Sequence, residues 1–390
     1  MKKFLPLLLA LSLLISAFSG CSRVEFDLPS EKTRESAPET AAPLFSTEET
    51  EEETVTVEEG VSPLFWRVTA PNGNELYLFG TIHIGDDRTR QVLQLVRPYL
   101  KKCEALSVEV NVVEEENDEA ALMQIVRMYL LTDGTTIKDH LPEDVYRDAV
   151  ALCKEYGIDP AQYGYDRFCP AMWDQIVQQF VAELESDLDF DGGVDRGLVE
   201  WAQRYGIPVL EAEDPAAHYG FELKYPDWYF ARDIRETLDS RDTYGEDLLK
   251  LYEAYLSGDQ DAFSEEVNGE LTEEDEAFID AHFSEEEKKA FYDGDYSAAQ
   301  VGELILRYGT DEEILDLTEY TREEFEVIVS YQKEMMDDRN EIILEAAKGY
   351  LNTYRTALLA VGAAHFEGGV GLVRLFEKAG FTVEEIKLNR

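Results

Sequence analysis

Two histidines in this sequence each follow a glycine by three residues. The motifs are Gly80-Thr-Ile-His83 and Gly362-Ala-Ala-His365, and the chain has five histidines in all. Each motif comes directly after an apolar run, 75–79 or 357–361, that predicts a buried strand. Glycine permits the sharp turn and removes a β-carbon that would crowd such a site. The pair therefore indicates a functional site, although a hydrogen-bonded turn histidine remains the alternative for either motif alone.

Two carboxylates follow other predicted strands. Glu109 lies near the end of the apolar run 105–110, and Glu211 closes the short strand 208–210. The carboxyl ends of parallel strands share one edge of a sheet, where ligands bind. Two imidazoles with one or two carboxylates are a usual ligand set for a catalytic divalent metal. The sequence thus predicts a site for Mn²⁺, Co²⁺ or Zn²⁺ formed by the side chains of His83, His365, Glu109 and Glu211.

The elements that position these residues come from both ends of the folded part. Strands 64–68 and 75–79 form a hairpin, the apolar spacing over 87–101 predicts a helix, and 105–110 is the next strand. A strand at 357–361, a helix over 370–379 that Gly380 ends, and a final strand close the chain. Residues 117–345 are mostly helical in pattern, interrupted at 205–214 by a short strand, 208–210, that follows the amphipathic helix 194–205. We expect an α/β fold with a central parallel-rich sheet built from both ends of the domain and a large helical insertion.

Two further residues have weaker patterns. Asp195 is interpreted as the N-cap of the helix 194–205, in a solvated turn, rather than as part of a calcium loop that begins at Asp187. His218 follows Glu211 by seven residues and is assigned a surface or packing role, with membership of the site as the alternative.

The beginning of the chain is typical of an exported lipoprotein. Lys2 and Lys3 precede an apolar run over 4–18, and Ser19-Gly20 lead into Cys21. We expect residues 1–21 to be a lipoprotein signal peptide with lipidation at Cys21; an uncleaved anchor or a plain secretory signal is the alternative. Residues 22–60 are rich in Glu, Thr, Ser and Pro and predict a disordered acidic linker, so the folded domain spans 61–390. The expected location is the extracytoplasmic face of the cell membrane, held by a lipid anchor.

The composition limits the classes of partner. A hydrophobic content of 44% is enough for a sizeable core, and 83 acidic against 35 basic residues give a formal charge of −48. That charge repels phosphate backbones, so nucleic acid is excluded as a partner. Besides Cys21 there are Cys103, Cys153 and Cys169, which allow at most one disulfide; the alternative is that all three are small buried side chains.

The sequence resembles the TraB/GumN family over about residues 62–390. The matching segments are "LFGTIHIG", the acid in "LSVEV", "GVDRGLVEWAQRYGIPVLEAE", "MMDDRNEIILEAA" and "LLAVGAAHFEGGVGLVRLFEKAGFTVEEI". The family includes the animal Tiki proteins and is grouped with the ChaN and erythromycin-esterase-like folds. The resemblance implies that His83, Glu109 and His365 are metal-site residues and that Arg339, on a long helix, faces the pocket. It also implies metal-dependent peptide cleavage, as for the Tiki members, or restraint of peptide signals, as for some bacterial members.

These observations together favour a membrane-tethered, extracytoplasmic, metal-dependent hydrolase with peptide or protein substrates. In that interpretation the metal polarises the carbonyl and activates water, Glu109 is a ligand or the general base, and Arg339 steadies the oxyanion. The alternative from another class is a non-catalytic surface protein that binds and sequesters a secreted peptide. An esterase acting on a small molecule is a third hypothesis.

Overall fold

The computed structural model describes residues 56–189, 193–269 and 271–389. The predicted signal peptide, Cys21 and nearly all of the predicted linker lie outside these residues, as do residues 190–192 of the segment considered for calcium. No helix in the described part of the chain is long and apolar enough to cross a membrane.

One six-stranded sheet organises the protein, in the order β4-β3-β5-β2-β1-β6. The strands are β1 (Phe65–Thr69), β2 (Glu75–Thr81), β3 (Ala105–Val108), β4 (Val209–Glu211), β5 (Thr356–Gly362) and β6 (Thr382–Glu385). Strands β4, β3, β5 and β2 are mutually parallel, while β1 pairs antiparallel with both β2 and β6. The expected hairpin at the start of the domain is confirmed. So is the parallel-rich sheet built from both ends, since β2 and β5 are direct neighbours.

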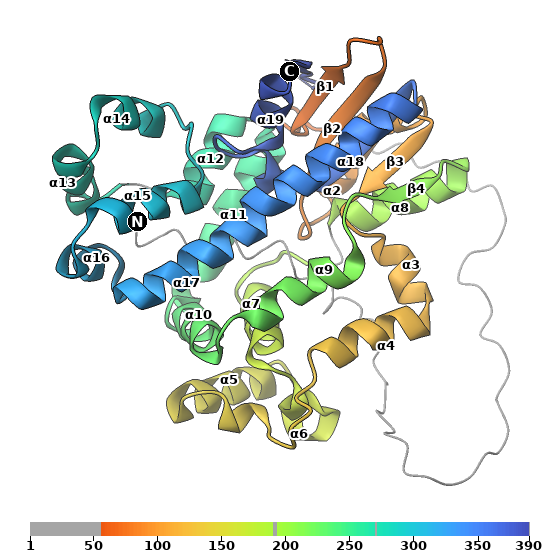
Figure 1. Cartoon of the computed structure of the whole chain (residues 1–390). Helices are drawn as coiled ribbons and strands as arrows, with labels where there is room; N and C mark the ends of the chain where they lie inside the picture. The colour runs from red at the N-terminus through yellow and green to blue at the C-terminus, as the bar shows by residue number, and fades with distance from the viewer. Residues whose placement is uncertain (1–55, 190–192, 270, 390) are drawn as a thin grey trace, which may run out of the picture.

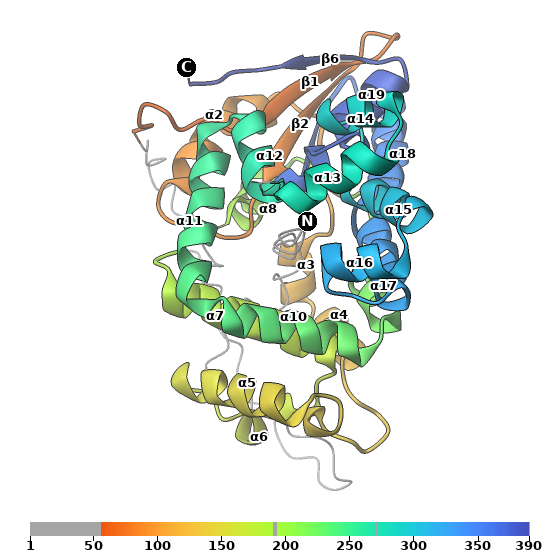
Figure 2. The same cartoon turned by 90° about the vertical axis from the view of Figure 1, so that its left-hand side faces the viewer.

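The central strands are buried because helices cover both faces of the sheet. Helices α2 (Thr89–Leu100) and α8 (Val194–Tyr205) lie on one face, and α18 (Arg339–Thr353) lies on the other, beside α19 (Leu372–Lys378). The two views show α18 crossing the strands on the side opposite α2 (Figures 1 and 2). β2 and β5 accordingly read as nearly continuous apolar runs, as parallel strands covered on both faces do.

The predicted helical insertion is confirmed, and it consists of two parts. The part between β3 and β4 holds α3 (Val112–Asn117), α4 (Glu119–Met128), η2 (Ile137–Asp139), α5 (Glu143–Glu155), α6 (Pro160–Tyr163), η3 (Tyr165–Arg167), α7 (Pro170–Glu185) and α8. The part between β4 and β5 begins with α9 (Pro215–Gly220), η5 (Phe221–Lys224), α10 (Asp227–Asp239), α11 (Arg241–Ser257) and α12 (Gln260–Asn268). Figure 2 shows α7 and α10 side by side below the sheet, with α5 and α6 beyond them.

Five consecutive helices of the insertion begin with the same capping signal. They are α13 (Glu273–His282), α14 (Glu285–Tyr292), α15 (Ala298–Tyr308), α16 (Asp311–Thr318) and α17 (Arg322–Gln332). Each starts after a Ser or Thr whose side chain accepts from the backbone three residues on, and the side chain at that position bonds back to the cap. Part of the acidic composition of this region therefore fixes helix ends.

A long helical rod carries two site residues to the sheet. It consists of α17, a π-helical segment η6 (Lys333–Asp338) and α18, which follow one another without a break. Figure 1 shows this rod running from the helices α15 and α16 to the sheet. Arg339 and Asn340 stand directly after the π-helical segment, a type of irregularity that is frequent at functional sites.

Candidate active site

Three predicted site residues lie together at the carboxyl edge of neighbouring strands. His83 follows β2, His365 lies in the short turn η7 (Ala363–Phe366) after β5, and Glu109 follows β3 directly. Because β3, β5 and β2 are parallel and adjacent, their ends bring these side chains to one place. All three are buried, with exposed fractions of 6%, 1% and 7%. Parallel strand order thus explains how residues 26 to 282 positions apart share one site.

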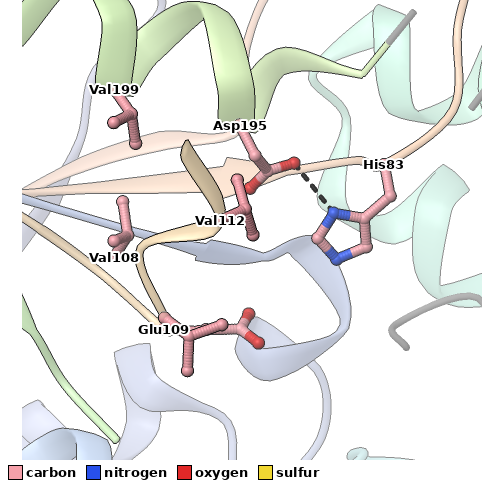
Figure 3. Close-up of a pocket in the computed structure, with 7 residues that line it drawn as sticks. His83, Val108, Glu109, Val112, Asp195 and Val199 are labelled. Carbon is pink, nitrogen blue, oxygen red and sulfur yellow. Dashed lines mark ion pairs between the residues drawn. The ribbon is translucent and has the colours of Figure 1, made fainter. Parts of the chain in front are cut away.

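A pocket at this edge is lined by His83, Glu109, Asp195 and four valines. Figure 3 shows the imidazole of His83 and the carboxylate of Glu109 directed toward the same space. Asp195, at the start of α8, places Oδ2 2.9 Å from Nδ1 of His83. The helix is capped by Gly193, not by Asp195, so the predicted N-cap role of Asp195 is wrong. An aspartate at a helix start fits either role locally, and only the folded chain brings His83 beside it.

Glu109 is held at both oxygens. Its Oε1 accepts a hydrogen bond of 2.6 Å from the backbone N–H of Gly362, and its Oε2 accepts one of 2.8 Å from Nη2 of Arg339. A β-carbon on residue 362 would lie 3.3 Å from Oε1. The glycine of the second motif therefore leaves room for this carboxylate against the backbone.

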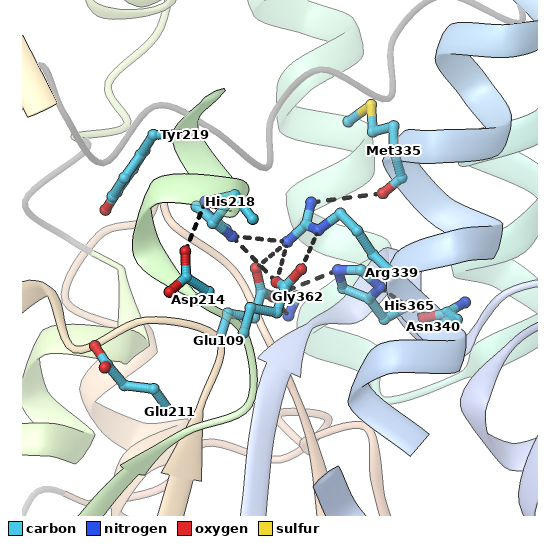
Figure 4. Close-up of polar contacts among 12 residues, drawn as sticks. Glu109, Glu211, Asp214, His218, Tyr219, Met335, Arg339, Asn340, Gly362 and His365 are labelled. Carbon is cyan, nitrogen blue, oxygen red and sulfur yellow. Dashed lines mark hydrogen bonds and ion pairs between the residues drawn. The ribbon is translucent and has the colours of Figure 1, made fainter. Parts of the chain in front are cut away.

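Arg339 is the centre of a buried ionic network (Figure 4). Its Nε and Nη2 donate to the two oxygens of Glu213 at 2.8 and 2.7 Å, in addition to the bond to Glu109. Nδ1 of His218 lies 3.1 Å from Glu213 Oε2 and 3.2 Å from Arg339 Nη2. His218 is 2% exposed and belongs to this network, so it does not have a surface role.

The network fixes the charges of the carboxylates. Burial acts to raise the pKa of Glu109, but the charge of His365, which is protonated in the acid range, and the charge of Arg339 outweigh it and lower the pKa to about 2. Burial likewise opposes ionisation of Glu213, and hydrogen bonds from Arg339 and His218 lower its pKa below the usual value. Burial lowers the pKa of His365 to about 4, although Glu109 acts in the other direction. At neutral pH His365 is therefore uncharged, and Arg339 is the cation that keeps Glu109 ionised.

The two motif histidines have different partners. Burial opposes protonation of His83, but the charge and proximity of Asp195 prevail and raise its pKa. Nδ1 of His365 lies 2.7 Å from Oδ1 of Asn340, a neutral side chain. In the described part of the chain, the Nε2 atoms of both histidines are buried without a hydrogen-bond partner. Each ring thus has one nitrogen held by a neighbour and the other directed into the site.

Glu211 does not join these residues. It is exposed, and its Oε1 accepts a hydrogen bond of 2.9 Å from the backbone N–H of Asn111. Figure 4 shows its carboxylate well apart from Glu109 and His365. Glu213, two positions later, occupies the site instead. The chain bends after β4, so strand alternation does not show which of Glu211 and Glu213 faces the site. The two residues are of the same type, and the sequence alone therefore did not distinguish them. The one available signal was that His218 follows Glu213 closely.

The fit of a divalent metal can be judged from the donor atoms. Among the described residues, one group of three or more potential ligands brings its atoms within 4.8 Å of one another: Glu109, Glu213 and His218. Arg339 already neutralises that group. By contrast, Nε2 of His365 and Oε1 of Glu109 face each other at 3.6 Å, and Nε2 of His83 has no partner in the described part of the chain. The ligand atoms of His83, His365 and Glu109 do not all come within 4.8 Å of one another among the described residues. Their chemical type nevertheless fits a transition metal ion, for which imidazole and carboxylate are common ligands.

The fold and this site define an α/β protein with a buried histidine, glutamate and arginine centre at the carboxyl ends of parallel strands. The model of the TraB/PrgY/gumN family matches residues 64–385, and the chain belongs to this family. The resemblance inferred from short motifs is thereby confirmed. Comparisons with curated proteins and with solved structures gave no significant match.

The three cysteines in the described part of the chain are free. Cys103 and Cys153 are buried and Cys169 is half-buried. Burial raises the pKa of the Cys103 and Cys153 thiols to about 12, so neither is a reactive thiolate at neutral pH. The interpretation as small buried side chains is confirmed for Cys103 and Cys153, whereas Cys169 is only half-buried.

Proposed function

We propose that the protein is a metal-dependent hydrolase that cleaves peptide bonds at the extracytoplasmic face of the cell membrane. The observation that supports this most strongly is the pair of acceptors at the site. Nε2 of His365 and Oε1 of Glu109 are buried 3.6 Å apart, and burial keeps His365 uncharged at neutral pH. Oε1 of Glu109 already accepts from the N–H of Gly362, but Nε2 of His365 has no partner among the described residues, and a cation near both atoms would satisfy it.

The residues proposed to hold the ion are His83, His365 and Glu109. Mn²⁺, Co²⁺ and Zn²⁺ are the candidates, and a bound ion supplies Lewis acidity toward a substrate carbonyl group. Glu211 is too far from the other donors in this conformation to be included. Glu213 and His218 are excluded from the set because Arg339 donates to both oxygens of Glu213, and Nδ1 of His218 lies against the same pair.

The other side chains have roles that follow from their contacts. Arg339 uses Nε and Nη2 to hold Glu213 and Glu109, which fixes the position of the Glu109 carboxylate. Within the described residues, its Nη1 makes only a long contact of 3.5 Å, to the carbonyl oxygen of Met335. This nitrogen is therefore the one that can donate to a developing oxyanion. Asp195 stabilises a proton on His83, so His83 is also placed to carry a proton when it does not bind metal.

Membrane attachment rests on the beginning of the sequence. Lys2 and Lys3, the apolar run 4–18 and Ser19-Gly20-Cys21 are arranged for lipid transfer to Cys21. The acidic residues 22–60 would then separate the domain from a negatively charged membrane surface.

Metal content tests the proposal directly. The purified full chain is incubated in turn with Mn²⁺, Co²⁺ and Zn²⁺, desalted and analysed for metal. We expect near-stoichiometric binding of at least one ion and its loss in His83→Ala and His365→Ala. Binding should weaken as the pH falls through the histidine range, because imidazole ligates in its neutral form.

Two other histidines provide matched controls. His140 lies 2.7 Å from Asp227 and His282 lies 3.0 Å from Glu313, both outside the site. His140→Ala and His282→Ala should therefore retain the metal. If the wild type binds none of the three ions, and a chelator leaves its effect on peptides unchanged, the hydrolase proposal is wrong. Retained binding of intact peptide would then favour sequestration of a secreted peptide.

A further inference from the structure

Asn340 is a buried amide, 1% exposed, whose two ends have different partners. Its Nδ2 lies 2.9 Å from the backbone carbonyl oxygen of Val370, and its Oδ1 lies 2.7 Å from Nδ1 of His365. A backbone carbonyl oxygen only accepts hydrogen bonds, so the NH₂ group must face Val370. The amide orientation is thereby determined by chemistry, and the carbonyl oxygen of Asn340 must face the histidine.

This orientation determines which nitrogen of His365 carries the proton. Oδ1 of Asn340 only accepts, so a hydrogen bond at 2.7 Å requires a proton on Nδ1. In the neutral ring Nε2 then has a bare lone pair. That nitrogen is buried, has no hydrogen-bond partner among the residues that the structure describes, and faces Oε1 of Glu109. We infer that Asn340 is a positioning residue that holds His365 in the Nδ1–H tautomer and keeps its Nε2 lone pair available to a ligand.

The opposite tautomer would close the site. A proton on Nε2 would point toward Oε1 of Glu109, and the two groups could form a hydrogen bond with each other. Nδ1 would then present a lone pair to Oδ1 of Asn340, which is repulsive. Asn340 thus disfavours the paired arrangement of His365 with Glu109 and leaves both atoms as acceptors.

The helical rod explains how two consecutive residues serve different parts of the site. Side chains one position apart on a helix point about 100° apart. Arg339 therefore reaches Glu213 and Glu109 while Asn340 reaches His365, as Figure 4 shows. Asn340 also ties the segment after η7 to the rod through Val370.

The tautomer can be measured without metal or substrate. Histidine is labelled with ¹⁵N in the full chain, metal is removed with a chelator, and two-bond ¹H–¹⁵N correlations are recorded at about pH 8. With five histidines the spectrum is simple, and His365→Gln identifies the His365 signals. We expect a pyrrole-like Nδ1 and a pyridine-like Nε2 for His365. A wild-type spectrum with the proton on Nε2 overturns the inference, whatever happens in variants.

Two substitutions separate positioning from structural support. Asn340→Asp keeps an acceptor for Nδ1–H and should keep the tautomer, although it loses the bond to Val370. Asn340→Leu removes the acceptor, and the His365 proton should move to Nε2 in most molecules. Asn268→Leu, at an exposed asparagine on α12, is the control and should leave the His365 signals unchanged. A folded Asn340→Leu variant with the wild-type tautomer also contradicts the inference.

A second measurement connects the inference to the proposed function, on which this part rests. Outer-shell partners of histidine ligands change metal affinity by about 10–100-fold. Asn340→Leu should therefore weaken Co²⁺ binding by about that factor, and Asn340→Asp should weaken it less. The tautomer is recorded in the metal-free protein, so a protein that binds no metal could still show the expected tautomer of His365. Equally, a protein that binds metal could show the proton on Nε2, and the two proposals can therefore fail separately.

Discussion

Replacement of Arg339 by methionine is the sharpest test of the ionic network. The change removes three charge-assisted hydrogen bonds, two to Glu213 and one to Glu109, while a side chain of similar length fills part of the space. The side chains of Glu213 and Glu109 are 5% and 8% exposed, so water cannot replace the guanidinium. Leaving buried charges without their partner costs about 3–5 kcal/mol. We expect a loss of this size in the free energy of unfolding at pH 7.

The pH dependence of that loss follows from the pKa directions. In the wild type the pKa of Glu109 is lowered to about 2, and that of Glu213 is also lowered. Both carboxylates therefore stabilise the folded state above about pH 4.5, and this stabilisation is lost as the pH falls toward 2. Without Arg339, burial raises both pKa values, so each carboxyl group favours folding below about pH 4.5 and this contribution to stability is lost at higher pH. The difference between wild type and variant should therefore be smaller at pH 4 than at pH 7.

Urea unfolding at the two pH values measures the difference, with Arg241→Met as the matched control. Arg241 also bridges two glutamates, Glu155 and Glu185, but its side chain is 27% exposed and those of its partners are 52% and 31% exposed. An exposed pair contributes at most about 1 kcal/mol, so this control should change little. Adding Glu213→Gln to Arg339→Met should recover part of the loss. A loss below about 1 kcal/mol for Arg339→Met, or an equal loss at pH 4 and pH 7, would refute the reasoning.

Three other changes test separate parts of the structure. In Gly193→Ala the new β-carbon would lie 2.7–2.8 Å from backbone atoms of His83, so we expect urea unfolding to show destabilisation by about 1–3 kcal/mol. Gly349 in α18 has open space around it, so the control Gly349→Ala should stabilise by about 0.5–1 kcal/mol. Similar effects of the two substitutions would contradict the close approach of Gly193 to His83. Glu222 is buried, which raises its pKa to about 7, so it favours folding below about pH 4.5 and loses that effect as the pH rises through 7. Glu222→Gln should therefore gain stability relative to wild type by about 3 kcal/mol between pH 4.5 and pH 8, and a constant difference across this range would contradict the assignment. Cys21→Ala should abolish labelling by a fatty-acid analogue in an expressing bacterium while Cys103→Ala keeps it, and undiminished labelling of Cys21→Ala would remove the lipid anchor from consideration.

Local signals in the sequence were enough to predict the sheet edge and three of its residues. Apolar runs of strand length gave β2, β3 and β5, and the glycines after β2 and β5 gave the two turns. Glu109 follows a buried run directly, so its place at the edge needed no knowledge of the insertion. The order of the strands was not predictable in this way, because β5 lies between β2 and β3 although it comes about 250 residues later.

The partners of the histidines could not be predicted from local patterns. Asp195 has the sequence position of an ordinary helix cap. It reaches His83 because the start of α8 packs on this turn: Gly193 approaches the backbone of His83. The N–H of Val194 also donates to the carbonyl oxygen of Ile82. Asn340 is one of several polar residues on a long helix. Its role depends on Val370 and His365, which lie 30 and 25 positions away. Such residues become visible only when all hydrogen-bond partners of a buried group are considered together.

The geometry also bears on whether Glu109 would act as a ligand or as a general base. A base must take up a proton near the working pH, and a pKa of about 2 makes Glu109 a weak one. Its oxygens are fixed by Arg339 and by the N–H of Gly362, which prevents the rotation that a proton shuttle needs. His83 differs in both respects, because Asp195 raises its pKa and its Nε2 has no hydrogen-bond partner in the part of the chain that the structure describes. Within the proposed hydrolase we therefore expect Glu109 to supply fixed negative charge beside His365, and proton transfer to depend on His83 only while that residue does not bind the ion.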